Sequence, residues 1–367
     1  MRSFRSLMNN VERCLLYSQN PDMQGTLKIL VIRFARLGDV ILLVPALRAL
    51  RRRFPNAQID VLVDSRFADV LRMCSAVTEV VAVDRIALRD ESRLKSIASI
   101  FGLMLRLRRK KYDIVLDCHS FRETHLLTWF TGARWRQGLK RVHSEYLSFC
   151  FNRSPTIEDD SAHVSSVFLS MMEPLGCQSL ENDHLLDVPP CRQEWTAQFL
   201  SSALSHRVWF VGLYVGAGSH SRTWPPENFA ELARRILCKP DVRIILFCGP
   251  DEEDLLMRCC SGIAENSRII CAPNLSLPNL AAMLSRCTAL VSNDTGPMHL
   301  GSASGVPTLG LFSVARPDHY HPLGRLARFI KSESIEEIPV ETVFQELEDL
   351  LKLCEKGKGS DFPAESR

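Results

Sequence analysis

The sequence predicts an α/β protein made of two doubly wound domains that face each other across a central cleft. Apolar, strand-like runs alternate with helical segments in both halves of the chain, which is typical of βαβ units on parallel sheets. The alternation stops in a polar stretch that contains Val188-Pro189-Pro190 and then starts again. A chain of 367 residues is long enough for two domains of ordinary size.

Four strands are expected in the first domain, with helical segments between them. The strands cover Lys28 to Phe34, Gln58 to Val63, Glu79 to Val83 and Tyr112 to Cys118. The helical segments carry apolar residues at helical spacing, and they are VILLVPALRALRRRF, SRFADVLRMC and the stretch from Ser92 to Arg109.

The second domain is expected to begin with the strand Arg207 to Val215. Helices and strands then alternate as ENFAELARRILC, VRIILFC, DEEDLLMRCCSGIA, SRIICA, LPNLAAMLSRC, TALVSN and PTLGLF. The expected division is an N-terminal extension 1–26, a first domain 27–185, a linker 186–206, a second domain 207–335, a C-terminal helix 336–355 and a disordered tail 356–367.

Composition favours a cytoplasmic protein. The apolar content of 46% supports a sizeable core, and no apolar run approaches the length needed to cross a bilayer. The first residues lack the apolar core and the cleavage site of a signal peptide. The 13 cysteines include no CxxC pair, so neither a disulfide framework nor a zinc site is expected.

Positive charge is concentrated in the first half of the chain. Residues 27–150 contain 23 Lys and Arg against 12 Asp and Glu, whereas residues 191–367 contain 18 against 21. The excess suggests an anionic partner for the first domain. Arg51 to Arg53 and Arg106 to Lys111 have an equally good explanation, since both runs end helical patterns, where cations suit the helix dipole.

The segment SNDTGPMHLGSASG follows an expected strand and suggests a seat for a phosphate group. Asp294 and Thr295 lie just beyond the strand, and Pro297 suits the first turn of a helix that Thr295 could cap. Backbone N–H groups from Gly296 onwards, with His299 near the same end, could donate to an anion. A capped turn without a ligand would use the same residues.

Two further loops of the second domain suggest the rest of a nucleotide diphosphate site. In GAGSHSRTWPP the glycines, among them Gly218, permit close approach of a phosphate, and Arg222 can neutralise it. In CGPDEE the carboxylates, Asp251 among them, could bind ribose hydroxyls or cap the following helix.

These loops resemble glycosyltransferase family 9, the heptosyltransferases of lipopolysaccharide core synthesis. The residues that carry the resemblance are SNDTGPMHLGSASGVPTLGLF, GAGSHSRTWPPENFAEL, NLSLPNLAAMLSRCTALV and, in the first half, ILVIRFARLGDVILLVPALRALRRRFPNAQIDVLV. The resemblance covers roughly residues 27–335 in the family's order. It implies a GT-B fold of two Rossmann-like domains, in which the first binds the acceptor and the second binds the nucleotide sugar.

The resemblance also implies an inverting transferase with ADP-heptose as donor substrate and the lipid-linked inner core saccharide as acceptor. It makes Asp39, in the loop RFARLGD, the general base, although this residue could be a plain helix cap. No Asp-x-Asp motif occurs in the chain, so metal-independent transfer without a cofactor is expected.

The acceptor is expected to meet cationic side chains at the strand ends of the first domain. The loop Asp117 to Glu123 departs from the family's usual sequence at His119-Ser120-Phe121, so the sequence does not identify the precise acceptor. The candidate acceptor-binding residues are Arg33, Arg36, Arg66, His119, Arg122 and Arg141.

The sequence also agrees with two other functions. One is a family-9-like transferase with another nucleotide sugar or acceptor, and the other is a nucleotide-sugar-binding protein without catalysis. A dehydrogenase is disfavoured because the first βα turn lacks GxGxxG, and the basic half lacks the interleaved aromatics of a nucleic-acid binder.

A weak peripheral contact with the cytoplasmic face of the inner membrane is also expected. The stretch Arg2 to Tyr17 has apolar residues at near-helical spacing among three arginines. The same stretch could instead pack on the protein or stay disordered.

Overall fold

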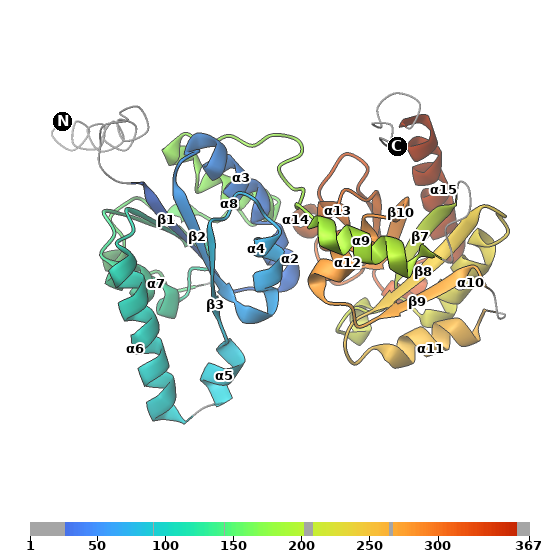
Figure 1. Ribbon diagram of the computed structural model, residues 1–367, viewed down its shortest axis with the longest axis horizontal. Coiled ribbons are helices and arrows are strands. Elements are labelled where there is room, and N and C mark those ends of the chain that lie inside the picture. The colour runs from blue at the N-terminus through green and yellow to red at the C-terminus, as the bar shows by residue number, and fades with distance from the viewer. Residues whose placement is uncertain (1–25, 91, 143, 202–207, 264–266, 358–367) are drawn as a thin grey trace. The chain divides into compact units, whose positions relative to one another are not determined.

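The computed structural model describes residues 26–90, 92–142, 144–201, 208–263 and 267–357. The chain divides into two compact units (Figure 1). Unit 1 comprises Met1–Arg36 and Leu43–Asp183, and unit 2 comprises Leu37–Leu42 and His184–Arg367. The expected amphipathic stretch Arg2 to Tyr17 lies outside the described residues.

Unit 1 is built on a six-stranded parallel sheet in the order β3-β2-β1-β4-β5-β6. Its strands are β1 (Lys28–Arg33), β2 (Gln58–Asp64), β3 (Glu79–Val83), β4 (Ile114–Asp117), β5 (Trp135–Lys140) and β6 (Thr156–Ile157). The central strands are almost wholly buried, as near-continuous apolar runs in a parallel sheet require.

The helices of unit 1 follow from periodic apolar positions and local end signals. They are α3 (Val44–Arg53), α4 (Ala68–Arg72), α5 (Arg85–Asp90), α6 (Arg93–Lys110), α7 (Arg122–Thr131) and α8 (Val164–Ser170). Helix α3 has Pro45 in its first turn and three arginines in its last, which suits the helix dipole. Helix α7 is followed by its C-cap residue Gly132, whose φ of 67° lies in the left-handed region that glycine adopts readily.

Unit 2 repeats the plan with the strand order β12-β11-β10-β7-β8-β9, again all parallel. Its strands are β7 (Trp209–Tyr214), β8 (Val242–Cys248), β9 (Ile269–Pro273), β10 (Ala289–Asn293), β11 (Thr308–Phe312) and β12 (Arg328–Lys331). Its helices are α2 (Leu37–Ile41), α9 (Pro190–Phe199), α10 (Pro226–Ile236), α11 (Glu253–Ser261), α12 (Leu277–Leu284), α13 (Gly296–Ala303), α14 (Pro317–Tyr320) and α15 (Val340–Gly357).

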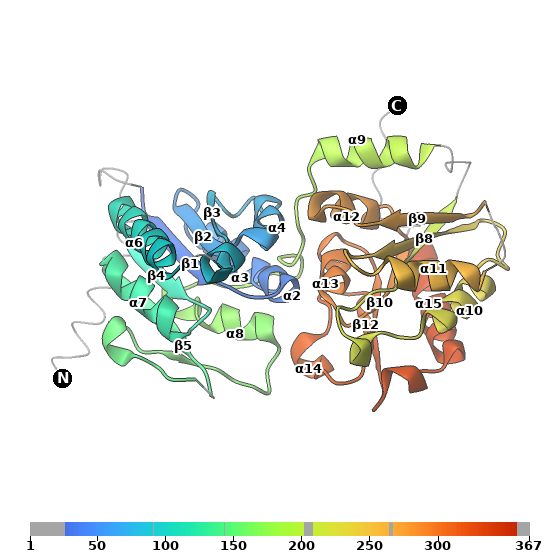
Figure 2. The ribbon, with the colours of Figure 1, turned by 90° about the horizontal axis from the view of Figure 1, so that it is seen from below.

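Two features of unit 2 differ from the expected division of the chain. Helix α9 occupies part of the expected linker 186–206 and lies alongside α12 (Figure 2). Helix α2 belongs to unit 2 rather than to the unit that surrounds it in the sequence, because it packs on α13. Among the described helices, none combines the length and the apolar character that a bilayer span requires.

Each sheet has a point at which the chain order reverses. Strand β1 lies between β2 and β4, and β7 lies between β8 and β10. In doubly wound sheets, ligands bind beyond the carboxyl ends of the strands at such a point. The loops after β7 and β10 in unit 2, and after β1 and β4 in unit 1, are therefore the places to look for a site.

Candidate functional site

A buried asparagine at the end of β10 holds the glycine-rich loop that follows β7. The Asn293 side chain is completely buried, and its Nδ2 donates to the carbonyl oxygens of Val215 at 3.0 Å and Gly216 at 3.1 Å. Its Oδ1 accepts from the Trp224 backbone N–H at 3.0 Å. One amide thus ties both ends of the loop to β10. This role of Asn293 was not predicted, although the residue directly precedes the Asp-Thr-Gly motif.

The far end of the loop is anchored by Trp224. Its indole ring is completely buried, and Nε1 donates to the Ile338 carbonyl oxygen at 3.0 Å. The ring also meets Phe229 of α10 edge to face, with centroids 4.9 Å apart. These contacts explain why the loop leaves the sheet and enters α10 in a defined direction.

A second contact fixes the glycines. The Glu252 carboxylate accepts from the backbone N–H groups of Gly218 and Gly249, both at 2.8 Å, and it lies against Gly216 so closely that a β-carbon there would collide with it. Gly218 itself has a φ of 64°. A side chain at position 216 would therefore displace the Glu252 carboxylate, and Gly218 suits a backbone conformation that other residues rarely adopt.

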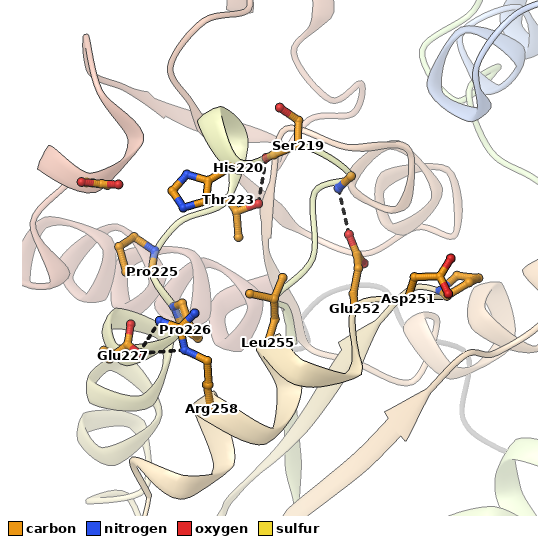
Figure 3. A pocket seen from close by; sticks show the side chains of 13 residues that line it. Ser219, His220, Thr223, Pro225, Pro226, Glu227, Asp251, Glu252, Leu255 and Arg258 are labelled. Atoms are coloured by element: carbon orange, nitrogen blue, oxygen red, sulfur yellow. Dashed lines mark hydrogen bonds and ion pairs between the residues drawn. The ribbon is translucent and has the colours of Figure 1, made fainter.

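A cavity of about 760 Å³ opens beside this contact (Figure 3). Its lining includes Gly218, His220, Asp251, Glu252 and Arg258. Asp251, the expected ribose ligand, is exposed on the lining and has a φ of 63°. Glu252 lines the same cavity, so the two neighbouring carboxylates that the sequence offers for ribose both lie here.

Arg222 joins the loop after β7 to the loop after β10. Its Nη1 donates to the Asp294 carbonyl oxygen at 3.3 Å and lies 3.7 Å from the Asp294 carboxylate. The two strand ends are level, since Tyr214 pairs with Ser292. The structure therefore brings Arg222 and Asp294 together, as expected for residues of converging loops.

The start of α13 lies at the same edge of the sheet. Thr295 is the N-cap residue in an extended conformation, and its side chain makes no capping hydrogen bond. Pro297 occupies the first turn. The simple expectation of a helix capped by the Thr295 hydroxyl is therefore wrong, and the helix start from Gly296 presents backbone N–H groups without that cap.

Helix α2 packs on the start of α13 through two glycines. A β-carbon on Gly38 would lie 2.7 Å from Cδ2 of His299, and a β-carbon on Gly296 would lie 2.7 Å from the Leu37 side chain. His299 is buried, and Asp39, next to Gly38, is half-buried. The segment that carries Asp39 thus lies against the helix that carries His299.

In unit 1, Arg33, His119 and Arg141 gather at the ends of β1 and β4. The buried Arg33 guanidinium donates to the Cys118 carbonyl oxygen at 2.8 Å and lies 4.7 Å from the centre of the Phe168 ring. Arg141 Nε donates to the His119 carbonyl oxygen at 3.0 Å.

The His119 imidazole is buried between aromatic rings of this cluster. It lies 5.8 Å from the Phe34 ring and 4.6 Å from the Phe121 ring. Burial first, and then the positive charges of Arg33 and Arg141, lower the pKa of His119 to about 2. The ring is therefore neutral at physiological pH. Arg85, which sequence reasoning missed, lies 5.4 Å from the Phe34 ring and adds positive charge near His119.

The turn that presents His119 is held by Asp117. Its Oδ1 accepts from the backbone N–H groups of His119 at 3.1 Å and Ser120 at 2.8 Å. Ser120 is buried with a φ of 60°, so the turn is unusual for a residue other than glycine. Burial raises the pKa of Asp117 to about 6, against the effect of these hydrogen bonds.

The remaining candidate acceptor residues are at the surface. Arg36 is exposed. Arg66 pairs with Asp64 at 2.9 Å, and Arg122 pairs with Glu145 at 3.0 Å while its side chain is 68% exposed. Arg66 and Arg122 are thus held in ion pairs at the surface of unit 1. In the described part of the chain, no group of three or more His, Cys, Asp and Glu is arranged to hold a metal ion.

Comparison with known proteins defines the class to which this fold and these loops belong. Residues 100–347 match the model of glycosyltransferase family 9 (heptosyltransferase). The chain therefore belongs to glycosyltransferase family 9, and it is a heptosyltransferase-like enzyme.

Individual relatives are distant. The chain is 28% identical over 312 residues to lipopolysaccharide heptosyltransferase 1 of Pseudomonas aeruginosa, and the aligned region covers 82% of each protein. It is 23% identical over 286 residues to lipopolysaccharide heptosyltransferase 3 of Escherichia coli, and the aligned region covers 77% of this chain and 82% of that protein.

Solved structures confirm the fold. The glycosyl transferase family 9 protein from Veillonella parvula matches with a TM-score of 0.77 at 25% identity, over 89% of this chain and 97% of that one. The E. coli heptosyltransferase WaaC with ADP matches with a TM-score of 0.73 at 21% identity, over 88% and 100%. The prediction of two doubly wound, GT-B-type α/β sheets is thus confirmed.

Proposed function

We propose that the chain is an inverting heptosyltransferase that moves heptose from ADP-heptose to a lipopolysaccharide inner-core acceptor, with Asp39 as general base. The observation that carries this proposal is the packing of α2 on α13 through Gly38 and Gly296. It brings the residue that would accept the acceptor's proton beside the helix start that would hold the donor's diphosphate.

On the donor side, each described contact has a role in this reaction. The diphosphate would accept hydrogen bonds from the start of α13 at Thr295 and Gly296 and from His299, with Arg222 and Gly218 nearby. Asp294 would keep Arg222 in place, because it already contacts that side chain. Asp251 and Glu252 would bind the ribose from the cavity that they line.

The transfer step would be a direct displacement. The acceptor oxygen forms a bond to the anomeric carbon as the bond from that carbon to the diphosphate breaks. The proton of the acceptor hydroxyl passes to Asp39, and the electron pair of the broken bond leaves with ADP. Negative charge grows on the diphosphate, where Arg222, His299 and the N–H groups of α13 stabilise it electrostatically. No metal or cofactor takes part in this scheme.

The acceptor would be an anionic saccharide carried on a lipid. Arg33, Arg141 and the neutral His119 form a cluster that could bind phosphate or carboxylate groups of such a saccharide, with Arg36, Arg66 and Arg122 as outer contacts. The neutral imidazole can donate one hydrogen bond and accept another, which suits sugar hydroxyls. In this proposal the enzyme acts in the cytoplasm, in weak contact with the inner membrane and with no role for nucleic acid.

A thermal-shift screen against a panel of nucleotide sugars, followed by a product assay with core acceptors, tests the proposal. We expect ADP-heptose to stabilise the protein most and to give a glycosylated product. Replacing Asp39 with Asn should leave donor binding nearly intact and slow turnover by about two to four powers of ten, the usual size of general base catalysis.

Two results would contradict parts of the proposal. Turnover within a few-fold of the parent would show that Asp39 is only a structural residue at a helix start. Binding of nucleotide sugars with no transfer or hydrolysis would favour a binding protein without catalysis, and stabilisation by another nucleotide sugar would change the donor.

A further inference from the structure

The first two turns of α6 expose large apolar side chains. Leu94 is 82% exposed, Ile97 is 63% exposed and Phe101 is 54% exposed. Their spacing of three and four residues places them on one face of the helix, called the α6 face below. Other residues of the helix, such as Leu103 and Leu107, pack on the core of unit 1. The α6 face is therefore not the core-facing side.

The α6 face is uncovered at its N-terminal end because α6 extends beyond the neighbouring helix α7. The same face continues to Arg108, whose Nη1 donates to the Phe130 carbonyl oxygen of α7 at 3.0 Å. Helices α6 and α7 are in contact, and Figure 1 shows α6 reaching past α7. Helix α7 thus accompanies only the C-terminal part of the face, where Leu105 is half-buried.

All charged residues of α6 are basic. Its sequence, RLKSIASIFGLMLRLRRK, contains six Lys and Arg and no Asp or Glu. Cations at the last turn suit the helix dipole, but Lys95 at the first turn opposes it. Helix stability therefore does not explain a basic residue at this end of the helix. The nearby Asp90 of α5 pairs with Arg89 at 2.9 Å.

We propose that the α6 face docks on the surface of an anionic phospholipid bilayer. Exposed apolar side chains of an interfacial helix enter the boundary between headgroups and acyl chains, while Lys and Arg meet the lipid phosphates. Leu94 to Phe101 spans about 10 Å of helix, at 1.5 Å per residue. Three side chains along so short a stretch of helix cannot bury the roughly 800 Å² per partner of a stable protein interface. Two copies of this cationic helix would also repel each other.

Sedimentation of the full-length chain with lipid vesicles tests the proposal. We compare vesicles of phosphatidylcholine with vesicles that also contain phosphatidylglycerol, at low and high salt. The parent should bind the anionic vesicles, and salt should release it because screening weakens contacts at the surface. The double variant Ile97→Gln with Phe101→Gln should bind at least about tenfold more weakly, given the worth of two buried apolar side chains.

The chain offers a matched control in unit 2. Met257 is 61% exposed and Val314 is 65% exposed, so the double variant Met257→Gln with Val314→Gln removes a similar exposed apolar surface. It should bind vesicles like the parent. Both double variants should keep the parent's unfolding midpoint and nucleotide affinity, so the outcome does not depend on the proposed transfer reaction. A variant without residues 1–20 should keep most of the binding.

Several outcomes would overturn the proposal. They are equal binding of the parent to neutral and anionic vesicles, no binding at low salt, an Ile97/Phe101 variant that binds like the parent, and an equal loss in the control variant. If light scattering shows a parent dimer that the Ile97/Phe101 variant lacks, with vesicle binding unchanged, the α6 face is a contact between copies instead.

Discussion

Replacing Asn293 with Ala should destabilise unit 2 and loosen the glycine-rich loop. The side chain is completely buried and makes three hydrogen bonds to backbone groups, at 3.0, 3.0 and 3.1 Å. Its removal leaves the Trp224 N–H and the carbonyl oxygens of Val215 and Gly216 without this partner. A buried polar group left unsatisfied costs about 1–3 kcal/mol, so three groups that relax in part should cost about 3 kcal/mol in total.

Denaturant unfolding followed by tryptophan fluorescence measures this change, since Trp224 is one of the loop's anchors. The linear extrapolation gives the free energy of unfolding with and without the side chain. Nucleotide affinity should fall by about tenfold or more, because the loop loses the bonds that set its shape. The variant Asn293→Asp should be no better, since a carboxylate cannot donate to the two carbonyl oxygens.

Asn279→Ala is the matched control, because its amide accepts one exposed hydrogen bond, from Arg192 at 3.3 Å. That variant should unfold within about 0.5 kcal/mol of the parent, as is usual at the surface. If Asn293→Ala unfolds within about 1 kcal/mol of the parent and binds nucleotide equally well, the loop does not depend on this residue. The three hydrogen bonds of the Asn293 amide would then not set the shape of the nucleotide-binding loop.

Three other predictions concern the phosphate seat, metal and pH. Arg222→Ala and His299→Ala should each weaken ADP binding or transfer by about 10- to 100-fold without unfolding the protein, as expected for hydrogen bonds to a charged group, and unchanged kinetics in both would exclude this phosphate seat. Chelation with EDTA should leave transfer intact, whereas complete loss that magnesium restores would require a metal site. Because the pKa of His119 is lowered to about 2 in the folded protein, the unfolded chain takes up this proton first as pH falls below about 6.5, and the parent should lose up to about 1.4 kcal/mol per pH unit relative to His119→Gln. Asp117, whose pKa is raised to about 6, contributes the opposite slope between about pH 4 and 6, so the comparison with the variant, rather than the parent's own pH profile, is the measurement.

The sequence by itself determined the two parallel sheets and the family. Apolar runs such as Lys28–Arg33 and Val242–Cys248 are buried on both faces, and this burial is visible as continuous hydrophobicity in the sequence. Glycine and proline mark the loops at the strand ends because few other residues fit there. Arg222 and Asp294 each follow an expected strand, and their contact could be anticipated because the carboxyl ends of parallel strands lie at one edge of the sheet.

Contacts between distant residues were decided only by the tertiary structure. Sequence pattern could not show that Glu252 would bond to Gly218, 34 residues away, or that Asn293 would hold a loop that begins 78 residues earlier. Neighbouring acidic residues such as Asp251 and Glu252 look alike in a sequence, and only the backbone path separates their directions.

The same limit applies to α2 and to the cationic cluster of unit 1. The sequence places Leu37–Leu42 inside the first domain, yet this segment packs with unit 2, because the small Gly38 lets it approach His299. Arg33, Arg66 and Arg122 are equivalent as charges in the sequence, but Arg33 is buried against Phe168 while Arg122 is exposed beside Glu145. A sequence records which side chains can carry charge; burial and partners, which set what each charge does, depend on the packing of the whole unit.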